Sequence, residues 1–467
     1  MPLHTRVFLP EAYGVVTEMY SYVAFLMIVL TYGFETAFFR FARNEEDKSS
    51  VFSTSLISLT ISSIVFFVLC LIFAQPIAST IRYPDHADYI IWFGLILFAE
   101  AITAVPFAKL RLENRPTRFA LIKLTNIAIN ILVNVFFLLI CPALLKSDSA
   151  SWRDFASIVY NPNFGVGYVF IANLVASLVT FAMLLPDMIK VPRIFNTELW
   201  RRMITYSFPL LIGGLAGITN EMFSRVSMKY QLPEDIAMHE LGIFGACYKV
   251  AVLMTIFIQT FRFAAEPFFF SQSKEKDAKK LYADVMTWFV IACCFIYLGV
   301  LLFMNVVKYF IGENYYEGLT IVPILLMANL FLGIFFNLSI WFKLNDKTHF
   351  GAWLAIFGAI LTIGLNYWWI PLYGYVGASW ATLVVYFSMM MISYFLGQKY
   401  YPVDYEKLKV VLYPLSAFAI TFLYPMVLPM EGSLSWIFKV LIIAAFMAVV
   451  WYLEIRKKRL ISRSTLK

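Results

Sequence analysis

Seven of the charged side chains within long apolar stretches of the sequence are candidates for a functional role. An ionised group in the bilayer interior costs several kcal/mol unless it faces a partner or a cavity, so each one is a candidate for ion pairing, ligand binding or proton transfer. The seven residues are the cations Arg225, Lys249 and Arg262 and the carboxylates Glu35, Glu100, Glu221 and Glu266.

Two of the carboxylates lie four residues from a cation on the same predicted helix. Glu221 can therefore pair with Arg225, and each such pair could simply hold the helix bundle together. Arg262 and Glu266 can pair in the same way or reach water from the nearby helix end. Lys249 lies deeper, about 12 Å into its apolar stretch at 1.5 Å per residue. We expect Lys249 to face a cavity.

The two remaining carboxylates differ in depth. Glu35 lies near the end of its apolar stretch, where one helical turn could bring it to water. Glu100 lies near the middle of its own stretch, with no basic residue within a helical turn. Glu100 could take up and release a transported proton, or it could be a neutral, hydrogen-bonded acid that serves packing.

Three asparagines form a polar stripe within another apolar stretch. Asn126, Asn130 and Asn134 are spaced by four residues, so they share one face of a helix, and Lys123 lies on the same side. In a membrane this stripe must face protein or a wet interior. Hydrogen bonding between helices is the commoner use of such residues, and contact with substrate is the alternative.

The composition is typical of a membrane protein. Hydrophobic residues make up 61% of the 467 residues, charged residues make up 14%, and the mean hydropathy is +0.76. The net charge of +8 arises from loop lysines and arginines, which indicate orientation and not a nucleic-acid partner. The histidines lie in loops or at helix boundaries, and the cysteines lack metal-ligand spacing. The sequence therefore predicts no metal site, no cofactor and no intramembrane enzyme.

Thirteen stretches are long and apolar enough to cross a bilayer as helices, which takes about 20 residues. They are expected at residues 12–38, 51–74, 89–108, 119–142, 165–186, 203–228, 241–268, 282–308, 318–342, 350–371, 375–397, 408–428 and 433–454. Basic residues concentrate in alternate loops, which places those loops and the C-terminus in the cytoplasm. Met1 then falls outside, which predicts that a first span is missing from a protein of fourteen spans.

The ends of two predicted helices repeat each other at an offset of 231 residues. Glu35 and Glu266 each stand just inside an apolar stretch, with aromatic residues three and four places later, and Gly14 matches Gly245. Two copies of one bundle predict a transporter whose site lies between the copies. The copies differ where Arg262 of the second corresponds to Thr31 of the first, so the second copy carries an additional cation.

Three segments carry a family resemblance. Residues 5–14 (TRVFLPEAYG), 30–41 (LTYGFETAFFRF) and 261–270 (FRFAAEPFFF) resemble the Wzx-type oligosaccharide flippases of the multidrug/oligosaccharidyl-lipid/polysaccharide (MOP) exporter superfamily. The resemblance implies an all-α, polytopic fold of two parallel six-helix lobes and two further C-terminal helices. On this basis the N-terminal lobe is expected at 1–190 without its first helix. The C-terminal lobe is expected at 191–400, and the extra helices with a basic tail at 401–467.

The resemblance also implies an activity. Such a flippase moves an undecaprenyl-pyrophosphate-linked oligosaccharide across the bacterial inner membrane for surface polysaccharide synthesis, including that of lipopolysaccharide O-antigen. Lys249, Arg225 and Arg262 would then offset the desolvation of the pyrophosphate, and the asparagine stripe could contact sugars. Coupling to a proton or sodium gradient is expected of the family. The expected partners are the lipid-linked substrate, membrane lipids, and a polysaccharide polymerase or glycosyltransferases.

Two rivals share the superfamily, and one belongs to another class. A lipid II flippase would differ in substrate alone, and a drug/cation antiporter would favour the acidic groups Glu35, Glu100, Glu221 and Glu266. A membrane-embedded glycan polymerase would need a large catalytic loop outside the membrane, and the predicted outer loops are too short for one.

Overall fold

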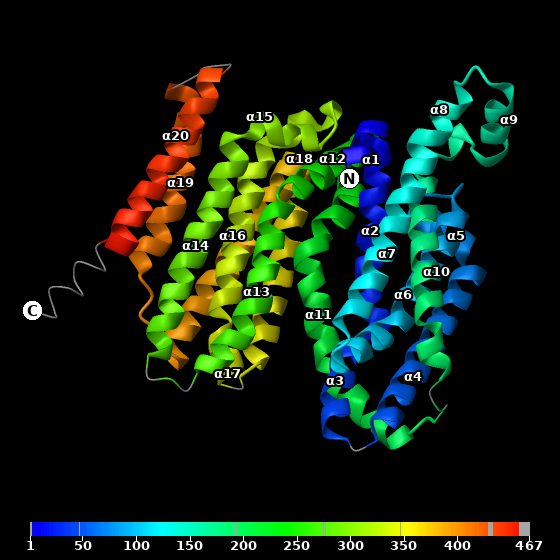
Figure 1. The fold of residues 1–467 in the computed structure, drawn as a ribbon, viewed down its shortest axis with the longest axis horizontal. Coiled ribbons are helices and arrows are strands. Elements are labelled where there is room, and N and C mark those ends of the chain that lie inside the picture. Colours follow the sequence, from blue (N-terminus) through cyan, green and yellow to red (C-terminus); the bar gives the residue numbers. More distant parts are fainter. Residues whose placement is uncertain are drawn as a thin grey trace, which may run out of the picture. The chain divides into compact units, whose positions relative to one another are not determined.

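The structure is a computed structural model that describes residues 2–456, except 46, 191, 193, 274, 276, 346 and 428–432. The expected basic tail beyond residue 456 lies outside these residues. All regular elements of the described chain are helices, as the sequence predicts (Figure 1). The chain divides into two compact units. The N-terminal unit is Val7–Gly242, and the C-terminal unit is Ile243–Lys467 together with Met1–Arg6.

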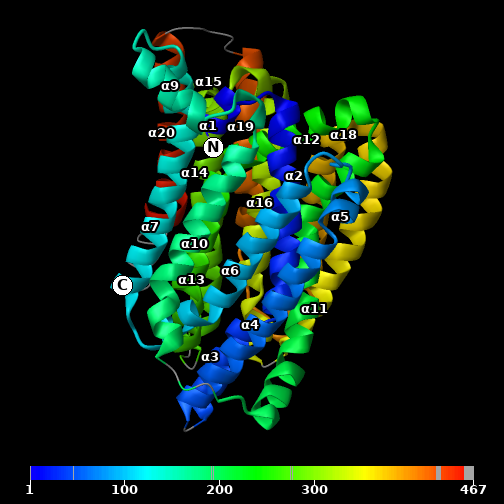
Figure 2. The same ribbon diagram turned by 90° about the vertical axis from the view of Figure 1, so that its right-hand side faces the viewer.

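The N-terminal unit is built mainly from five long helices and one very long one. Within it α4, α6 and α10 run side by side (Figure 2). Its elements are α2 (Pro10–Thr31), α3 (Phe34–Asn44), α4 (Lys48–Ile72), α5 (Ala74–Thr80), α6 (Ala87–Leu112), α7 (Pro116–Val135), η1 (Phe136–Ile140), α8 (Cys141–Leu145), α9 (Ala150–Val159), η2 (Pro162–Phe164), α10 (Gly167–Ile189), α11 (Thr197–Gln231) and the first half of α12 (Glu234–Val250).

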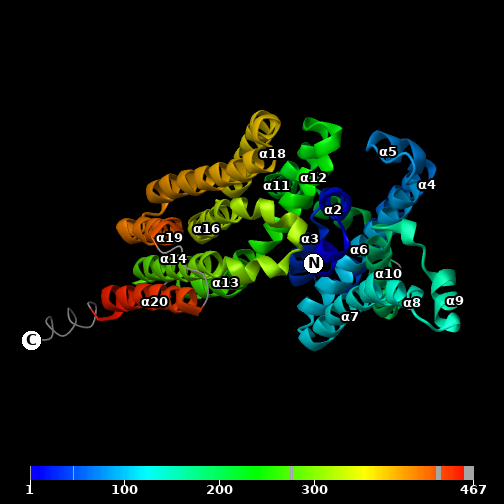
Figure 3. The same ribbon diagram turned by 90° about the horizontal axis from the view of Figure 1, so that it is seen from above.

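The C-terminal unit contains the remaining helices and the start of the chain. The last two long helices, α19 and α20, both pack against α14 (Figure 3). The elements are most of α1 (Pro2–Val7), the second half of α12, α13 (Val252–Gln272), α14 (Ala278–Leu302), α15 (Met304–Val307), η3 (Lys308–Phe310), η4 (Glu313–Ile321), α16 (Val322–Leu338), α17 (Ile340–Leu344), α18 (His349–Tyr400), α19 (Lys407–Val427), α20 (Ser433–Val450) and η5 (Trp451–Arg456).

Twelve helical segments of the described chain are long and apolar enough to cross a membrane. One of them, α18, has 52 residues and would be about 78 Å long if straight, more than twice the thickness of a bilayer core. It is broken at Gly374, whose φ of 54° is readily adopted by glycine. The two halves therefore correspond to the separate spans expected at 350–371 and 375–397, and counting them separately restores the expected thirteen.

The two units do not coincide with the domain boundaries expected at residues 190 and 400. The division falls inside α12, because α11 packs along α2 and α3 of the N-terminal unit. The C-terminal helices α19 and α20 belong to the same unit as α14. The two units are sets of helices that contact one another closely, and such sets need not equal the two copies of a repeat. The lobe boundaries expected from the sequence therefore stay a prediction.

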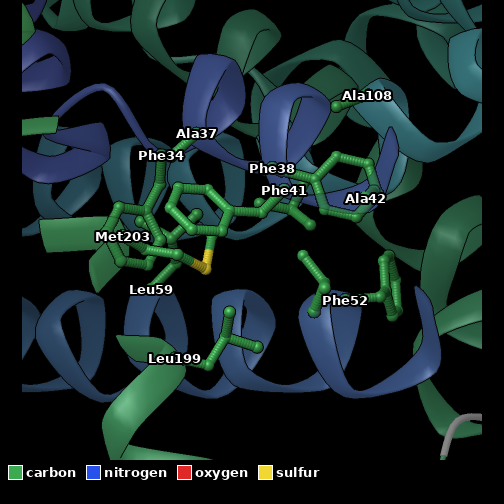
Figure 4. Packing of buried hydrophobic residues seen from close by; sticks show 12 residues of the cluster. Phe34, Ala37, Phe38, Phe41, Ala42, Phe52, Leu59, Ala108, Leu199 and Met203 are labelled. Atoms are coloured by element: carbon green, nitrogen blue, oxygen red, sulfur yellow. The ribbon is translucent and has the colours of Figure 1, made fainter. Parts of the chain in front are cut away.

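Helix α3 packs as an amphipathic segment in the N-terminal unit. Its apolar residues recur at the spacing that places them on one face: Phe34, Ala37, Phe38, Phe41 and Ala42 are all buried. This face packs on α4, α6 and α11, where Phe38 meets Phe52 edge to face at 6.0 Å between ring centroids (Figure 4). The packing fixes the rotation of α3, and with it the direction of Glu35.

Candidate functional site

A polar cavity of about 310 Å³ lies inside the N-terminal unit. Helices α3, α6, α7 and α10 supply its polar groups, and three of the residues singled out in the sequence are among them: Glu35, Glu100 and Asn126. The polar lining is completed by Thr103, Arg111, Lys123, Ser177 and Thr180.

The groups of this cavity are linked across helices. Glu100 of α6 accepts a hydrogen bond from the Ser177 hydroxyl of α10, with 2.8 Å between Oε1 and Oγ. Asn126 of α7 donates from Nδ2 to Thr180 Oγ1 at 2.9 Å. The ammonium of Lys123 stands 4.2 Å from the centroid of the Phe107 ring, a cation–π contact. The cavity thus contains both a carboxylate and an ammonium, the pair of groups that can exchange a proton or hold an ion.

Only the first asparagine of the predicted stripe faces the cavity. Asn134 is buried and donates to Asn130 Oδ1 at 3.1 Å, so these two amides bond to each other along α7. The Asn126 bond to Thr180 runs between helices, which is the commoner use weighed for the stripe.

A second polar cluster lies in the C-terminal unit at the C-terminal part of α13. Arg262 approaches Glu266 with 3.5 Å between Nε and Oε1, and its guanidinium lies 4.7 Å from the centre of the Phe336 ring. Lys343 of α17 donates to the same Glu266 oxygen. Together with Asn337 these residues line a shallow depression.

The two clusters contain matching ion pairs. In the N-terminal unit Arg111 binds Glu35 with 2.5 Å between Nη2 and Oε1, and in the C-terminal unit Lys343 binds Glu266. The partners are 76 residues apart in the first pair and 77 in the second. The internal repeat recognised from the glutamates therefore extends to their cations. Neither cation was predicted as a site residue, because Arg111 and Lys343 lie among the basic residues at helix ends that indicate orientation.

The other predicted residues occupy separate places. Arg225 is buried on α11 and contacts the sulfur of Met222, and Glu221, one turn earlier, is exposed. Lys249 lies in the last turn of α12 with an exposed side chain. The single span expected at 241–268 is divided at Ala251 into the end of α12 and all but the last residues of α13. Lys249 therefore lies at the end of a helix and not within a continuous span.

One buried ion pair of the N-terminal unit was not predicted from the sequence. Glu18 of α2 and Lys229 of α11 are 0% and 4% exposed, with 2.9 Å between Oε2 and Nζ. Glu18 also accepts from the hydroxyls of Tyr22 at 2.6 Å and Tyr83 at 2.5 Å, and Lys229 also donates to the Ile81 carbonyl. The sequence signal was present, since Glu18 lies inside the span expected at 12–38.

Tyr83 acts as a hydrogen-bond donor in this cluster. Tyr83 lies in the connection between α5 and α6, where burial and the adjacent Glu18 carboxylate raise the pKa of its hydroxyl. The hydroxyl therefore stays protonated and donates a hydrogen bond to Glu18. With Tyr22 and Lys229 also donating, the carboxylate has the three partners that a buried charge needs.

The fold is that of MOP-superfamily transporters. The chain is similar to an inward-facing multidrug-resistance transporter of the MATE family, with a TM-score of 0.68 and 15% identity over 85% of this chain and 92% of that chain. It is similar to the lipid II flippase MurJ in an inward closed conformation, with a TM-score of 0.68 and 13% identity over 96% of this chain and 95% of that chain. It is also similar to a MOP-superfamily transporter from Pyrococcus furiosus, described as having a binding pocket of reverse polarity. Here the TM-score is 0.58 and the sequence identity is 15%, over 83% of this chain and 87% of that chain.

The sequence identifies the family within this fold. Residues 1–273, more than half of the 467, match the model of the polysaccharide biosynthesis protein family. The chain belongs to this family, which confirms the resemblance to the polysaccharide flippases of the MOP superfamily. No curated protein sequence matches the chain.

Proposed function

We propose that this protein is a flippase that moves an undecaprenyl-pyrophosphate-linked oligosaccharide from the cytoplasmic to the periplasmic leaflet of the bacterial inner membrane. The observation that carries the proposal is the family match over residues 1–273 in a chain with the MOP transporter fold. The oligosaccharide would serve surface polysaccharide synthesis, such as that of O-antigen. Alternating access of two lobes would expose the substrate first to one side and then to the other.

In this proposal the intramembrane cations bind the pyrophosphate. A doubly phosphorylated group loses its hydration on entering a low-dielectric region, and guanidinium and ammonium groups replace the lost water. Arg225, Lys249 and Arg262 are the residues proposed for this role. Of the three, Arg262 contacts Glu266, which also binds Lys343. A phosphate could therefore draw Arg262 away from Glu266, and Glu266 would keep Lys343 as its partner.

The polar cavity of the N-terminal unit, which contains Glu100, is proposed as the site that couples transport to a proton or sodium gradient. Glu100 lies there next to a serine donor and in the same cavity as Lys123. Binding of a proton or sodium ion would cancel the carboxylate charge and thereby change the hydrogen bonds that join α6 to α10. Glu35 and Glu266 hold matching positions in the two units, where they tie one helix to another.

The rival functions use the same fold. A lipid II flippase would keep the pyrophosphate and change the sugar, so the described residues do not separate it from the proposed function. A drug/cation antiporter would use the carboxylates Glu35 and Glu100 of the N-terminal polar cavity, but Arg111 and Lys123 in the same lining balance their charge.

The proposal is tested in a bacterial strain that lacks its own oligosaccharide flippase. Expression of the protein should restore surface polysaccharide, and the C-terminus, tagged with a reporter, should be found in the cytoplasm. Co-purification of a polysaccharide polymerase or glycosyltransferase would identify the expected partners. Surface glycan that stays absent although the protein is present in the membrane would contradict the proposal.

The coupling role has its own matched variants. Glu100→Gln should reduce export at least tenfold at unchanged protein level, because the amide cannot exchange the ion. Ser177→Ala removes only the hydrogen bond to Glu100 and should retain most of the export. Equal export by the Glu100→Gln variant and the unaltered protein would exclude Glu100 from coupling.

A further inference from the structure

A second cavity of the N-terminal unit, about 400 Å³ in volume, has an apolar lining. Helices α2, α4, α5, α6 and α11 contribute to it, and its two polar side chains are Tyr22 and Cys70. The Tyr22 hydroxyl is engaged by Glu18 and by the Tyr230 hydroxyl at 2.7 Å, and Cys70 is a buried thiol. The cavity is partly open, and its lining offers water almost no hydrogen-bond partner, which favours an apolar ligand.

The surroundings indicate where an apolar ligand would come from. Phe66 and Cys70 of α4 line the cavity, and residues on the other side of the same helix form an exposed apolar stripe. That stripe consists of Ile61, Val65, Leu69 and Ile72. Because α4 is one of the membrane-crossing helices, lipid chains would lie against this stripe, within one helix diameter of the cavity.

The size of the cavity favours one acyl chain. An apolar cavity of about 150 Å³ binds benzene, so a cavity of about 400 Å³ holds roughly 16 carbons by proportion. This is the length of a single phospholipid chain. An undecaprenyl group of eleven five-carbon units would exceed it several-fold.

Charged groups mark one end of the cavity. Glu18 lies one turn before Tyr22 on α2, Lys229 lies three residues after Val226 on α11, and Arg82 follows Ile81. Arg82 pairs at 3.0 Å with Glu234, and both side chains are well exposed, at 43% and 80%. Exposed pairs of this kind are weak, so a phosphate can compete for the guanidinium.

We propose that this cavity binds one acyl chain of a membrane phospholipid, with the lipid phosphate near Arg82. The bound chain fills the space between α2, α6 and α11 and supports the packing of α11 on its unit. The site is separate from the cavity that contains Glu100, and the proposal does not depend on the transported substrate.

The test uses the full protein in nanodiscs of phosphatidylglycerol that contain a small fraction of the same lipid with a diazirine in the middle of one chain. After irradiation, mass spectrometry locates the adducts. We expect adducts on cavity residues such as Met19 and Phe93, neither of which is exposed to a lipid-facing surface. Val226→Phe should lower these adducts at least twofold, because its four additional carbons take up about a quarter of the space for roughly 16.

Val65→Phe is the matched control, since it makes the same change on the exposed stripe of α4. It should leave the cavity adducts unchanged. If Val226→Phe does not fold, Val23→Phe places the same ring in the cavity from α2. Cavity adducts that are absent from the unaltered protein, or that are not reduced in the variant with the added ring, would overturn the proposal.

A competition arm identifies the source of the chain. The phosphatidylglycerol of the nanodisc already competes with the probe, so the cavity adducts should fall in proportion as the probe fraction is lowered. A tenfold excess of undecaprenyl pyrophosphate over the probe should not lower them further. Displacement by the prenyl lipid alone would overturn the assignment to a phospholipid. Flippase activity is not measured in this experiment, so its outcome is independent of the proposed function.

Discussion

Removing the ammonium of Lys229 is predicted to destabilise the N-terminal unit severely. In the Lys229→Met variant the carboxylate of Glu18, which is 0% exposed, keeps its two tyrosine donors but loses its counter-charge. Breaking a buried ion pair by removing one partner costs about 3–5 kcal/mol. For a unit of this size 1 kcal/mol corresponds to roughly 2–4 °C, so the melting temperature should fall by about 6–20 °C.

The cysteines of the chain provide the assay. All five are buried and unpaired, so a thiol-reactive fluorescent dye reacts with them only on unfolding, and its signal reports the melting temperature in detergent. The double variant Glu18→Gln/Lys229→Met should recover to within about 1 kcal/mol of the unaltered protein, because the amide still accepts from both tyrosines and no charge is buried. The exposed pair supplies the control, and Arg82→Gln should cost less than about 1 kcal/mol.

Two results would refute this reasoning. A loss of less than about 1 kcal/mol in Lys229→Met would mean that water or another cation reaches Glu18. A double variant as unstable as Lys229→Met alone would mean that the lysine contributes through packing and not through its charge.

Two further predictions concern packing and transport. Gly14→Ala should destabilise the unit by about 1–3 kcal/mol, because an added Cβ would collide with the backbone carbonyl of Met238. Gly213→Ala, where a Cβ meets nothing within 4 Å, should be neutral or slightly stabilising, and equal melting temperatures of the two variants would contradict the close approach of α2 and α12. Lys249→Ala and Arg262→Ala should each impair glycan export at unchanged protein level, measured as surface polysaccharide per cell. Full export by both would remove the proposed role of these cations.

Much of the fold could be predicted from the sequence because a bilayer leaves the backbone few alternatives. An apolar stretch that crosses lipid must be helical, so the long spans and their order follow from hydropathy. The break at Gly374 was anticipated because the apolar residues 350–397 are too many for a single span. The break at Ala251 was not, because it interrupts an apolar run without a glycine or proline at the break itself.

The candidate site was only partly predictable for a different reason. Spacing along one helix indicates that a side chain needs a partner but not which helix supplies it. Glu35, Glu100 and Asn126 were identified as groups in need of partners, whereas Arg111 and Ser177, which satisfy two of them, lie 76 and 77 residues away in the chain. Basic residues at helix ends were interpreted only as markers of the cytoplasmic side. That rule does not distinguish a lysine or arginine in water from one that pairs with a carboxylate of its own unit, as Arg111 and Lys343 do.

Movement of a lipid-linked oligosaccharide by this protein can be measured in reconstituted liposomes. The protein is placed in liposomes with a fluorescent undecaprenyl-pyrophosphate oligosaccharide, with labelled lipid II or with a fluorescent organic cation. Transport is measured as the fraction that becomes accessible to, or protected from, an external quencher. The account predicts that the oligosaccharide lipid crosses the bilayer faster than in protein-free liposomes and that the other two do not. Transport of lipid II or the cation, with the oligosaccharide lipid no faster than in protein-free liposomes, would contradict it.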